Sequence, residues 1–178
     1  MLNINSRLAQ PFRMALAVLI LSALSVGCRR EFRPSLKTGF EGQSLPGFDL
    51  LLPDSTTVFN TADIPKGRPV VLMYFSPNCP YSQAEMNNII NDISVLKNIQ
   101  FCIFTTWPFR QFKGFYAYFK LNKYSNIIAG EDFKHFFEDH FKPKGVPYTM
   151  VYNKDRILSK AFLGTMPSAQ IEEVVAKD

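Results

Sequence analysis

The sequence predicts an α/β domain in which a mixed central sheet is flanked by helices. Two continuous apolar runs, at residues 70–75 and 99–106, are typical of buried parallel strands, because strands covered on both faces show no alternation. The segment between them has apolar residues at helical spacing, so the three pieces form a strand–helix–strand unit. At 178 residues, with 47% of them hydrophobic, the chain suits one domain with a sizeable core.

A hairpin is predicted ahead of the central strand. Its strands lie at residues 48–52 and at about 57–60, separated by turn residues at 53–55, and it belongs at the edge of the sheet. A loop with two prolines and a glycine, residues 65–69, leads from it into the strand at 70–75.

Helices are predicted where apolar residues recur at i, i+3, i+4 and i+7. The first begins at Pro80 and carries Met86, Ile89, Ile90, Ile93 and Leu96. The second carries Phe112, Phe115, Tyr116 and Phe119, and the third carries Phe133, Phe136, Phe137 and His140. The chain ends with strands at 148–153 and 157–164 and a helix at about 168–177.

The amino terminus is predicted to be an export signal. Arg7 and Arg13 precede a 13-residue apolar stretch at 14–26, which is too short to span a bilayer comfortably. The stretch ends in Ser25-Val26-Gly27-Cys28, which resembles the lipobox of bacterial lipoproteins and implies that Cys28 is lipidated. An ordinary cleaved signal and an uncleaved anchor are the alternatives.

The domain boundaries follow from this signal. We expect a lipoprotein signal peptide at 1–27, a lipidated polar tether at 28–45, and a folded domain at 46–178. The domain would face an extracytoplasmic compartment, anchored to the membrane by its lipid, where disulfides persist. Without the leader's two arginines the formal charge falls from +5 to +3, which gives no indication of nucleic-acid binding.

Cys79 is the strongest candidate for chemistry. It lies between the central strand and the following helix, where unpaired N–H groups and the helix dipole stabilise a thiolate, the reactive form of cysteine. Pro80 suits the first helical turn, and Asn78 or Ser76 could cap the helix. A cysteine left as a relic in an inactive fold is the alternative.

Three stretches resemble the thioredoxin superfamily, and within it the exported TlpA/ResA-like (AhpC/TSA-type redoxin) branch. They are residues 42–50 (GQSLPGFDL), residues 66–72 (KGRPVVL) leading into residues 79–86 (CPYSQAEM), and residues 145–148 (GVPY). The resemblance covers about residues 42–178. It implies a thioredoxin-like fold, with a helical insertion at 107–140 before a cis-proline.

The resemblance also assigns site residues. It implies that the Val146-Pro147 bond is cis, with Pro147 against Cys79 and the backbone of Val146 presented to substrate. Glu85, six residues after Cys79, matches a glutamate that tunes the cysteines of ResA-like proteins; a solvated helix residue is the alternative. Pro80, Tyr81 and Trp107 are expected to line the substrate groove, although core packing suits Trp107 equally well.

Ser82 stands where the dithiol family has its second cysteine. A serine hydroxyl forms no disulfide, so the reaction stops at a mixed disulfide unless an external thiol or a redox partner completes it. Ser82 can still donate a hydrogen bond to the Cys79 thiolate. Cys102 is expected in the core, beyond the distance of about 7 Å that limits disulfide formation with Cys79.

No metal site and no cofactor is predicted. His135 and His140 lie five residues apart, so on one helix they point about 140° away from each other and cannot share an ion. Structural roles are the better interpretation of both.

Three functions remain open at this point. The first is a membrane-anchored monothiol thiol-disulfide oxidoreductase that acts through Cys79 on cysteines or disulfides of envelope proteins. The second is a one-cysteine peroxiredoxin-like enzyme, since Ser76-Pro77-Asn78-Cys79 echoes the Thr-x-x-Cys of peroxiredoxins, although Leu72 replaces their proline. The third is a non-catalytic module that binds a peptide in the groove around Cys79.

Overall fold

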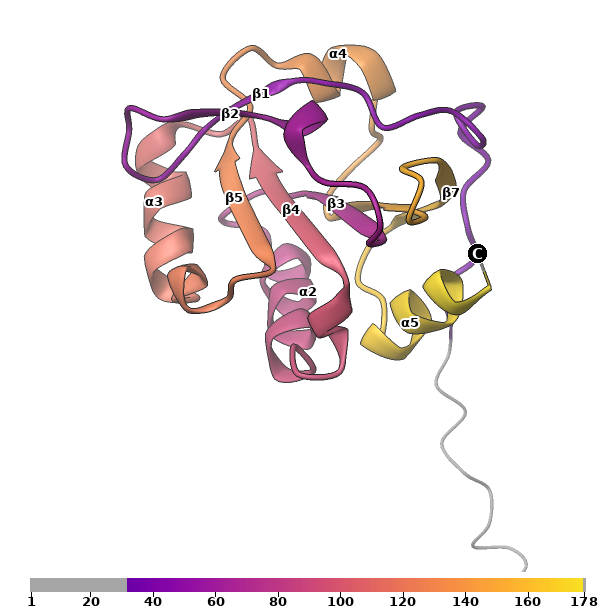
Figure 1. The fold of residues 1–178 in the computed structure, drawn as a ribbon. Coiled ribbons are helices and arrows are strands. Elements are labelled where there is room, and N and C mark those ends of the chain that lie inside the picture. Colours follow the sequence, from indigo (N-terminus) through magenta and orange to yellow (C-terminus); the bar gives the residue numbers. More distant parts are fainter. Residues whose placement is uncertain (1–31, 178) are drawn as a thin grey trace, which may run out of the picture. The chain divides into compact units, whose positions relative to one another are not determined.

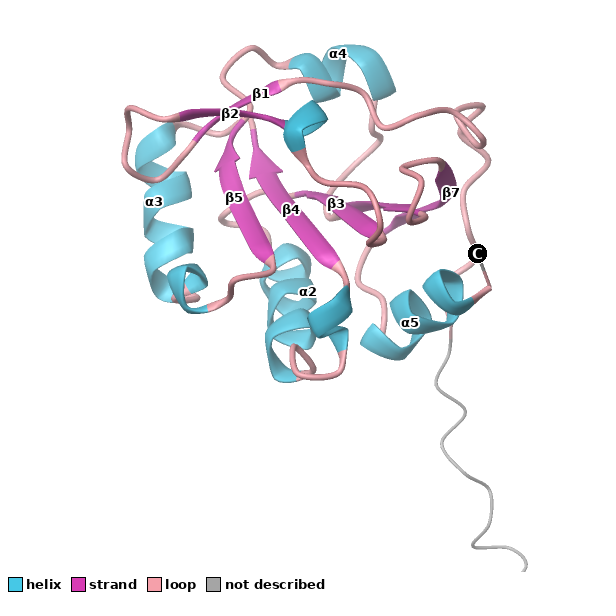
Figure 2. Ribbon diagram, viewed as in Figure 1, coloured by secondary structure: helices cyan, strands magenta, loops and turns pink. Residues whose placement is uncertain are grey.

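The computed structural model describes residues 32–177, which form one mixed seven-stranded sheet flanked by helices, as predicted (Figures 1 and 2). The strands are β1 (Asp49–Leu51), β2 (Val58–Asn60), β3 (Val70–Tyr74), β4 (Gln100–Thr105), β5 (Ile127–Glu131), β6 (Tyr148–Tyr152) and β7 (Leu158–Leu163). The helices are α2 (Pro80–Asn91), α3 (Phe109–Tyr118), α4 (Phe136–Phe141) and α5 (Ser168–Ala176). Short 3-10 helices lie at Thr61–Asp63, Leu96–Asn98 and Leu121–Lys123.

The sheet has the order β2-β1-β5-β4-β3-β6-β7. Strands β3, β4 and β5 are parallel neighbours, whereas β1, β2, β6 and β7 pair antiparallel. The carboxyl ends of the three parallel strands therefore meet at one edge of the sheet, where ligand sites of open α/β sheets usually lie. The loops that carry Cys79, Trp107 and Asp132 all leave from this edge.

The two faces of the sheet bury separate clusters. Successive β3 residues alternate between them, because neighbouring side chains of a strand point to opposite faces: Val71 and Met73 join one cluster, Leu72 and Tyr74 the other. Helices α2, α3 and α5 cover the first face. Helix α4 and the segment before β1 cover the second face, so the Phe-rich composition is divided between two cores.

Strand β5 was not predicted, because it lies within the stretch expected to be helical. Its sequence, Ile127-Ile128-Ala129-Gly130-Glu131, is short and contains a glycine, which weakens a strand pattern. Helix α4 is also shorter than expected: it begins at Phe136, so Phe133 lies outside it and is 41% exposed.

Gly130 is required by the close approach of β1. A Cβ at this position would lie 2.8 Å from Leu50 Cβ and 3.0 Å from the Leu51 carbonyl oxygen. We therefore expect Gly130→Ala to lower the free energy of unfolding by about 1–3 kcal/mol, measured by urea denaturation. Gly114→Ala in α3 is the matched control, since a Cβ there meets nothing within 4 Å and alanine favours a helix. Equal stability of Gly130→Ala and the wild type would contradict this account.

The tether predicted at 28–45 is wrong for residues 32–45, which belong to the folded domain. The N–H of Leu36 donates to the Ala161 carbonyl at 2.8 Å, and that of Leu45 donates to the Arg156 carbonyl at 2.8 Å. The segment has the Pro and Gly content of a linker, yet its backbone pairs with the outer edge of β7. An edge strand favours such pairing because its outward N–H and C=O groups have no partner in the sheet. The domain thus begins at about residue 32 rather than 46.

The predicted signal peptide, Cys28 and residues 29–31 lie outside the described residues. Within residues 32–177, no helix has the length and apolar character needed to cross a membrane.

Candidate active site

Cys79 occupies the N-cap position of α2. Pro80 is the first helical residue, and the first helical hydrogen bond runs from the Gln83 N–H to the Cys79 carbonyl at 3.0 Å. The N–H groups of Tyr81 and Ser82 precede that bond, so they have no partner within the helix and point toward the capping side chain. An N-cap side chain normally accepts such a hydrogen bond, but the Cys79 side chain makes none in this structure.

The predicted caps, Ser76 and Asn78, do not cap the helix. The Asn78 amide instead donates to Gln111 Oε1 in α3 at 3.1 Å, and the N–H of Ser76 donates to Ser82 Oγ at 3.3 Å. Because no side chain caps α2, its amino-terminal N–H groups are left for Cys79 or a ligand.

The backbone of Val146, the residue before Pro147, lies beside Cys79. The bond between Val146 and Pro147 is cis, and the Val146 carbonyl oxygen lies 3.8 Å from Cys79 Sγ. Pro147 is buried, while Cys79 and Val146 are partly exposed. The backbone of Val146 therefore borders the Cys79 sulfur.

Ser82 is fully buried in the first turn of α2. Its hydroxyl oxygen accepts a hydrogen bond from the Ser76 N–H, which is its one hydrogen bond within residues 32–177. The predicted hydrogen bond from Ser82 to Cys79 is therefore not formed. The hydroxyl thus supports the loop that leads from β3 to Cys79.

Glu85 is buried, so its interpretation as a solvated helix residue is wrong. Its Oε2 accepts from the Met166 N–H at 2.7 Å, whereas Oε1 has no partner among residues 32–177. Burial raises the pKa of Glu85 to about 8, although the Met166 hydrogen bond and the charge of Arg33 lower it. At neutral pH the carboxyl group is therefore mostly protonated and carries little negative charge.

The remaining groove residues differ in exposure. Tyr81 is 63% exposed and Pro80 is exposed beside it, so both can meet a partner. Trp107 is half-buried, and its ring centroid lies 6.1 Å from that of Tyr74, so part of it packs and part remains accessible.

Cys102 is a core residue, as predicted. It is fully buried in the second cluster, and burial raises the pKa of its thiol. Cys79 and Cys102 are both free thiols.

The two histidines have structural contacts. His135 lies just before α4 with a φ of 56°, and its Nδ1 lies 3.1 Å from Glu138 Oε2. The His140 ring stacks on Phe136. Within residues 32–177 no group of His, Cys, Asp and Glu side chains is arranged to hold a metal ion.

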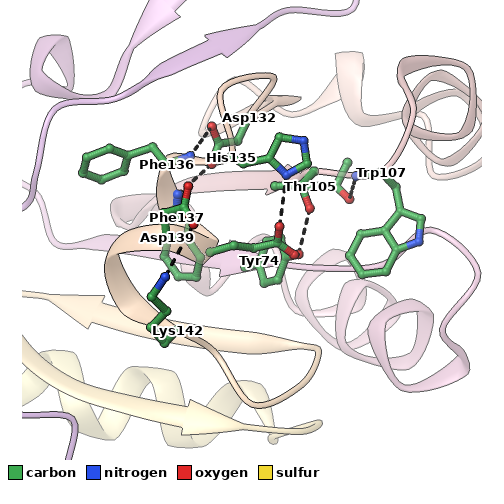
Figure 3. A network of polar contacts seen from close by, with 11 residues as sticks. Tyr74, Thr105, Trp107, Asp132, His135, Phe136, Phe137, Asp139 and Lys142 are labelled. Carbon is green, nitrogen blue, oxygen red and sulfur yellow. Dashed lines mark hydrogen bonds and ion pairs between the residues drawn. The ribbon is translucent and has the colours of Figure 1, made fainter.

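A polar network at the same sheet edge was missed by the sequence analysis (Figure 3). The Tyr74 hydroxyl at the end of β3 contacts both Thr106 Oγ1, at 2.9 Å, and Glu138 Oε1 of α4. Burial, followed by this hydrogen bond to Glu138, raises the pKa of Tyr74. Asp132 accepts from the N–H groups of Phe136 and Phe137 and so anchors the start of α4.

One signal could have revealed this network. Polar residues follow the carboxyl ends of adjacent parallel strands, Thr106 after β4 and Asp132 after β5, but the second is recognisable only once β5 is known.

Comparisons with known proteins identify the fold alone. No protein-family model matches the sequence, and no curated protein is similar to it. Among solved structures, a secreted disulfide oxidoreductase from Mycobacterium tuberculosis homologous to E. coli DsbE is 19% identical, over 74% of this chain and 96% of that chain, with a TM-score of 0.59. StoA from Bacillus subtilis is 15% identical, over 72% and 96%, with a TM-score of 0.56. Peroxidoxin BcpB from Mycobacterium tuberculosis is 15% identical, over 76% and 94%, with a TM-score of 0.60. The chain therefore has the thioredoxin-like fold.

Proposed function

We propose that the protein is a monothiol thiol-disulfide oxidoreductase that acts through Cys79 on cysteines or disulfides of envelope proteins. The observation that carries the proposal is the position of Cys79: it is partly exposed at the uncapped N-terminus of α2, and its Sγ faces the Val146 carbonyl oxygen at 3.8 Å. Structures with the same fold include a disulfide oxidoreductase, which supports this class of chemistry.

The reaction begins when the Cys79 thiolate attacks one sulfur of a client disulfide. A bond forms between Cys79 and that sulfur, and the other client sulfur leaves as a thiolate that takes a proton from water. Ser82, where the dithiol family has its second cysteine, cannot break the resulting mixed disulfide. An external thiol or a redox partner is needed to release the client and regenerate Cys79.

Glu85 is a positioning and tuning residue in this scheme. A nearby anion would disfavour the Cys79 thiolate, but a Glu85 with a pKa of about 8 is mostly neutral below that pH. Pro147 and Val146 shape the approach to Cys79, while Pro80, Tyr81 and Trp107 offer contacts to the client chain.

The location belongs to the proposal as well. The lipobox-like Ser25-Val26-Gly27-Cys28 supports a lipid anchor at Cys28, and hence a domain held on the extracytoplasmic side of a membrane. The disulfide oxidoreductase from Mycobacterium tuberculosis, which has the same fold, is described as a secreted protein.

A peroxidase activity is the second candidate, because peroxidoxin BcpB has the same fold. In this reaction a peroxide oxidises the Cys79 thiolate to a sulfenic acid and is itself reduced to water or an alcohol. A peroxide-consumption assay with a thiol reductant separates it from disulfide exchange. A protein that neither exchanges disulfides nor consumes peroxide would be a binding module.

The proposal is tested by trapping mixed disulfides. We expect the full-length protein with Cys28→Ser, incubated with an unfolded protein that contains disulfides, to give an adduct on a non-reducing gel that a reductant removes. Cys79→Ser should abolish the adduct, and Cys102→Ser should leave it unchanged because Cys102 is fully buried. An adduct that persists in Cys79→Ser, or that disappears in Cys102→Ser, would contradict the assignment.

A further inference from the structure

The segment before β1 holds an arginine beside the active site. The backbone of Arg33 is fixed by the buried side chain of Gln170 in α5. The Arg33 N–H donates to Gln170 Oε1 at 2.8 Å, and the Arg33 carbonyl accepts from Gln170 Nε2 at 2.6 Å. Three residues later, the N–H of Leu36 donates to the Ala161 carbonyl of β7. Arg33 was expected in the tether, but these contacts make it part of the folded domain.

The side chain of Arg33 reaches the loop between β7 and α5, which contacts the turn that carries the thiol. The Arg33 Nε donates to the Thr165 carbonyl at 2.8 Å. The Thr165 hydroxyl in turn donates to the Tyr81 carbonyl at 3.2 Å, in the first turn of α2. Tyr81 lies two residues after Cys79, so the Arg33 side chain is one residue removed from this turn.

The guanidinium group also lies over Gly164, on the side of the cis-proline. A Cβ at Gly164 would be 3.5 Å from Arg33 Cζ. The Gly164 N–H donates to the Pro147 carbonyl at 2.9 Å. Val146, directly before Pro147, has its carbonyl oxygen 3.8 Å from Cys79 Sγ. Arg33 is therefore connected to the site through two segments, the first turn of α2 and the cis-proline segment.

Arg33 brings an uncompensated positive charge to this place. It is exposed, and none of the ion pairs among residues 32–177 involves it. Its Nε is used for the loop, whereas its two Nη groups make no hydrogen bond in the same part of the chain. Glu85 is close enough for the charge of Arg33 to lower its pKa, but a pKa of about 8 leaves that carboxyl group mostly neutral at neutral pH. Both Nη groups thus remain available to an anion.

The segments that contact the site on this side add no negative charge. They contain no Asp or Glu, and they are residues 32–36, 75–83, 143–147 and 163–167. Lys144, in the cis-proline segment, is exposed and adds a second cation. Asp132 and Glu138, at the same sheet edge, are engaged in the polar network around Tyr74 and α4. The charge distribution therefore favours an anionic client chain over a cationic one.

We propose that Arg33 binds a carboxylate of the client chain, so that Cys79 reacts preferentially with clients whose cysteine is flanked by Asp or Glu. Arginine pairs with a carboxylate in a bidentate geometry, for which its two Nη groups are free. Because Gln170 already fixes the backbone of residue 33, little backbone freedom is lost on binding. This inference rests on the proposed function, since it names the class of substrate for the same site.

The test uses the full-length chain in detergent with Cys28→Ser and Cys102→Ser, which leaves Cys79 as the one cysteine of the original three. The probes are two short peptides, each with one cysteine activated as a pyridyl disulfide. Aspartates flank the cysteine in one peptide, and asparagines flank it in the other. The Cys79 thiolate attacks the peptide sulfur, a mixed disulfide forms, and pyridinethiolate leaves and takes a proton from water. The absorbance of the released pyridinethione gives the rate.

The quantity compared between variants is the ratio of the aspartate-peptide rate to the asparagine-peptide rate, because the intrinsic reactivities of the peptides and of Cys79 then cancel. We expect Arg33→Gln to lower this ratio about threefold. Arg33→Lys keeps the charge and should keep most of the ratio. Arg68→Gln, at an exposed position in the loop before β3 and so at the opposite edge of the sheet from Cys79, is the matched control and should leave the ratio unchanged.

The outcomes separate this inference from the proposed function. If Arg33 only supports the loop between β7 and α5, its replacement changes both rates alike. A ratio that is the same in Arg33→Gln and Arg68→Gln, with both peptides reacting, overturns the assignment of Arg33 while exchange at Cys79 stands. If neither peptide modifies Cys79, the inference and the proposed function are both overturned.

Discussion

Glu85→Gln is expected to stabilise the protein by about 4 kcal/mol at pH 8 and to leave its stability near pH 4 almost unchanged. Burial raises the pKa of Glu85 to about 8 in the folded protein, against the ordinary value of 4.5. The folded state therefore holds this proton more tightly than the unfolded state. The resulting stability is fully present below pH 4.5 and is lost as the pH rises toward 8.

Urea denaturation at pH 4, 6 and 8 measures this effect. The free energy of unfolding of the wild type should fall across the series, while that of Glu85→Gln should fall much less, since a glutamine has no proton to lose. Glu172→Gln, at an exposed position of α5, is the matched control and should follow the wild type. Parallel curves for Glu85→Gln and the wild type would show that Glu85 does not hold its proton in the folded state.

Ser82→Cys is expected to convert the one-cysteine site into a site that releases its own clients. Position 82 lies in the first turn of α2, three residues after Cys79, at the spacing of the dithiol family that the sequence resembles. A thiol tethered there has an effective concentration on the order of millimolar, so at micromolar external thiol we expect the mixed disulfide to be released at least about 100-fold faster. The rate should also become independent of the external thiol concentration.

Single-turnover release of a labelled peptide from Cys79 measures this rate. Ser94→Cys is the matched control, because it adds a thiol beyond the far end of α2 and should behave like the wild type. Ser82 is buried, so a thermal melt must show that the variant folds before the rates are compared. Release from Ser82→Cys that stays slow and proportional to external thiol would mean that position 82 does not face the mixed disulfide.

The central part of the fold could be predicted from sequence because its elements have strong and distinct patterns. The apolar run of β3 has one explanation, a strand covered on both faces, and the structure buries all five of its residues. Helix α3 shows a clear amphipathic pattern, with Phe112 and Phe115 buried. By contrast, β5 pairs with β4 and β1, and the close approach of β1 requires a glycine at position 130. Local sequence does not encode these contacts.

Some site residues could likewise be placed from local sequence, whereas others depend on contacts with distant parts of the chain. The position of Cys79 follows from the strand-to-helix joint, which local sequence specifies. The burial of Glu85 does not, since it depends on the segment around Met166, 81 residues away along the chain. The contact between Tyr74 and Glu138 likewise joins β3 to α4, 64 residues apart, and only the folded sheet brings the two together. Residues 32–45 resemble a linker locally, yet they pair with β7.

The most direct test of the central claim is the rate at which Cys79 is alkylated at pH 6. The full-length chain with Cys28→Ser and Cys102→Ser is treated with iodoacetamide in its folded state and in concentrated urea, so the same cysteine is its own reference. Stabilisation of the thiolate at the N-terminus of α2 predicts alkylation at least about fivefold faster in the folded protein. Alkylation that is equal or slower in the folded protein would contradict the account, because Cys79 would then not be an activated nucleophile.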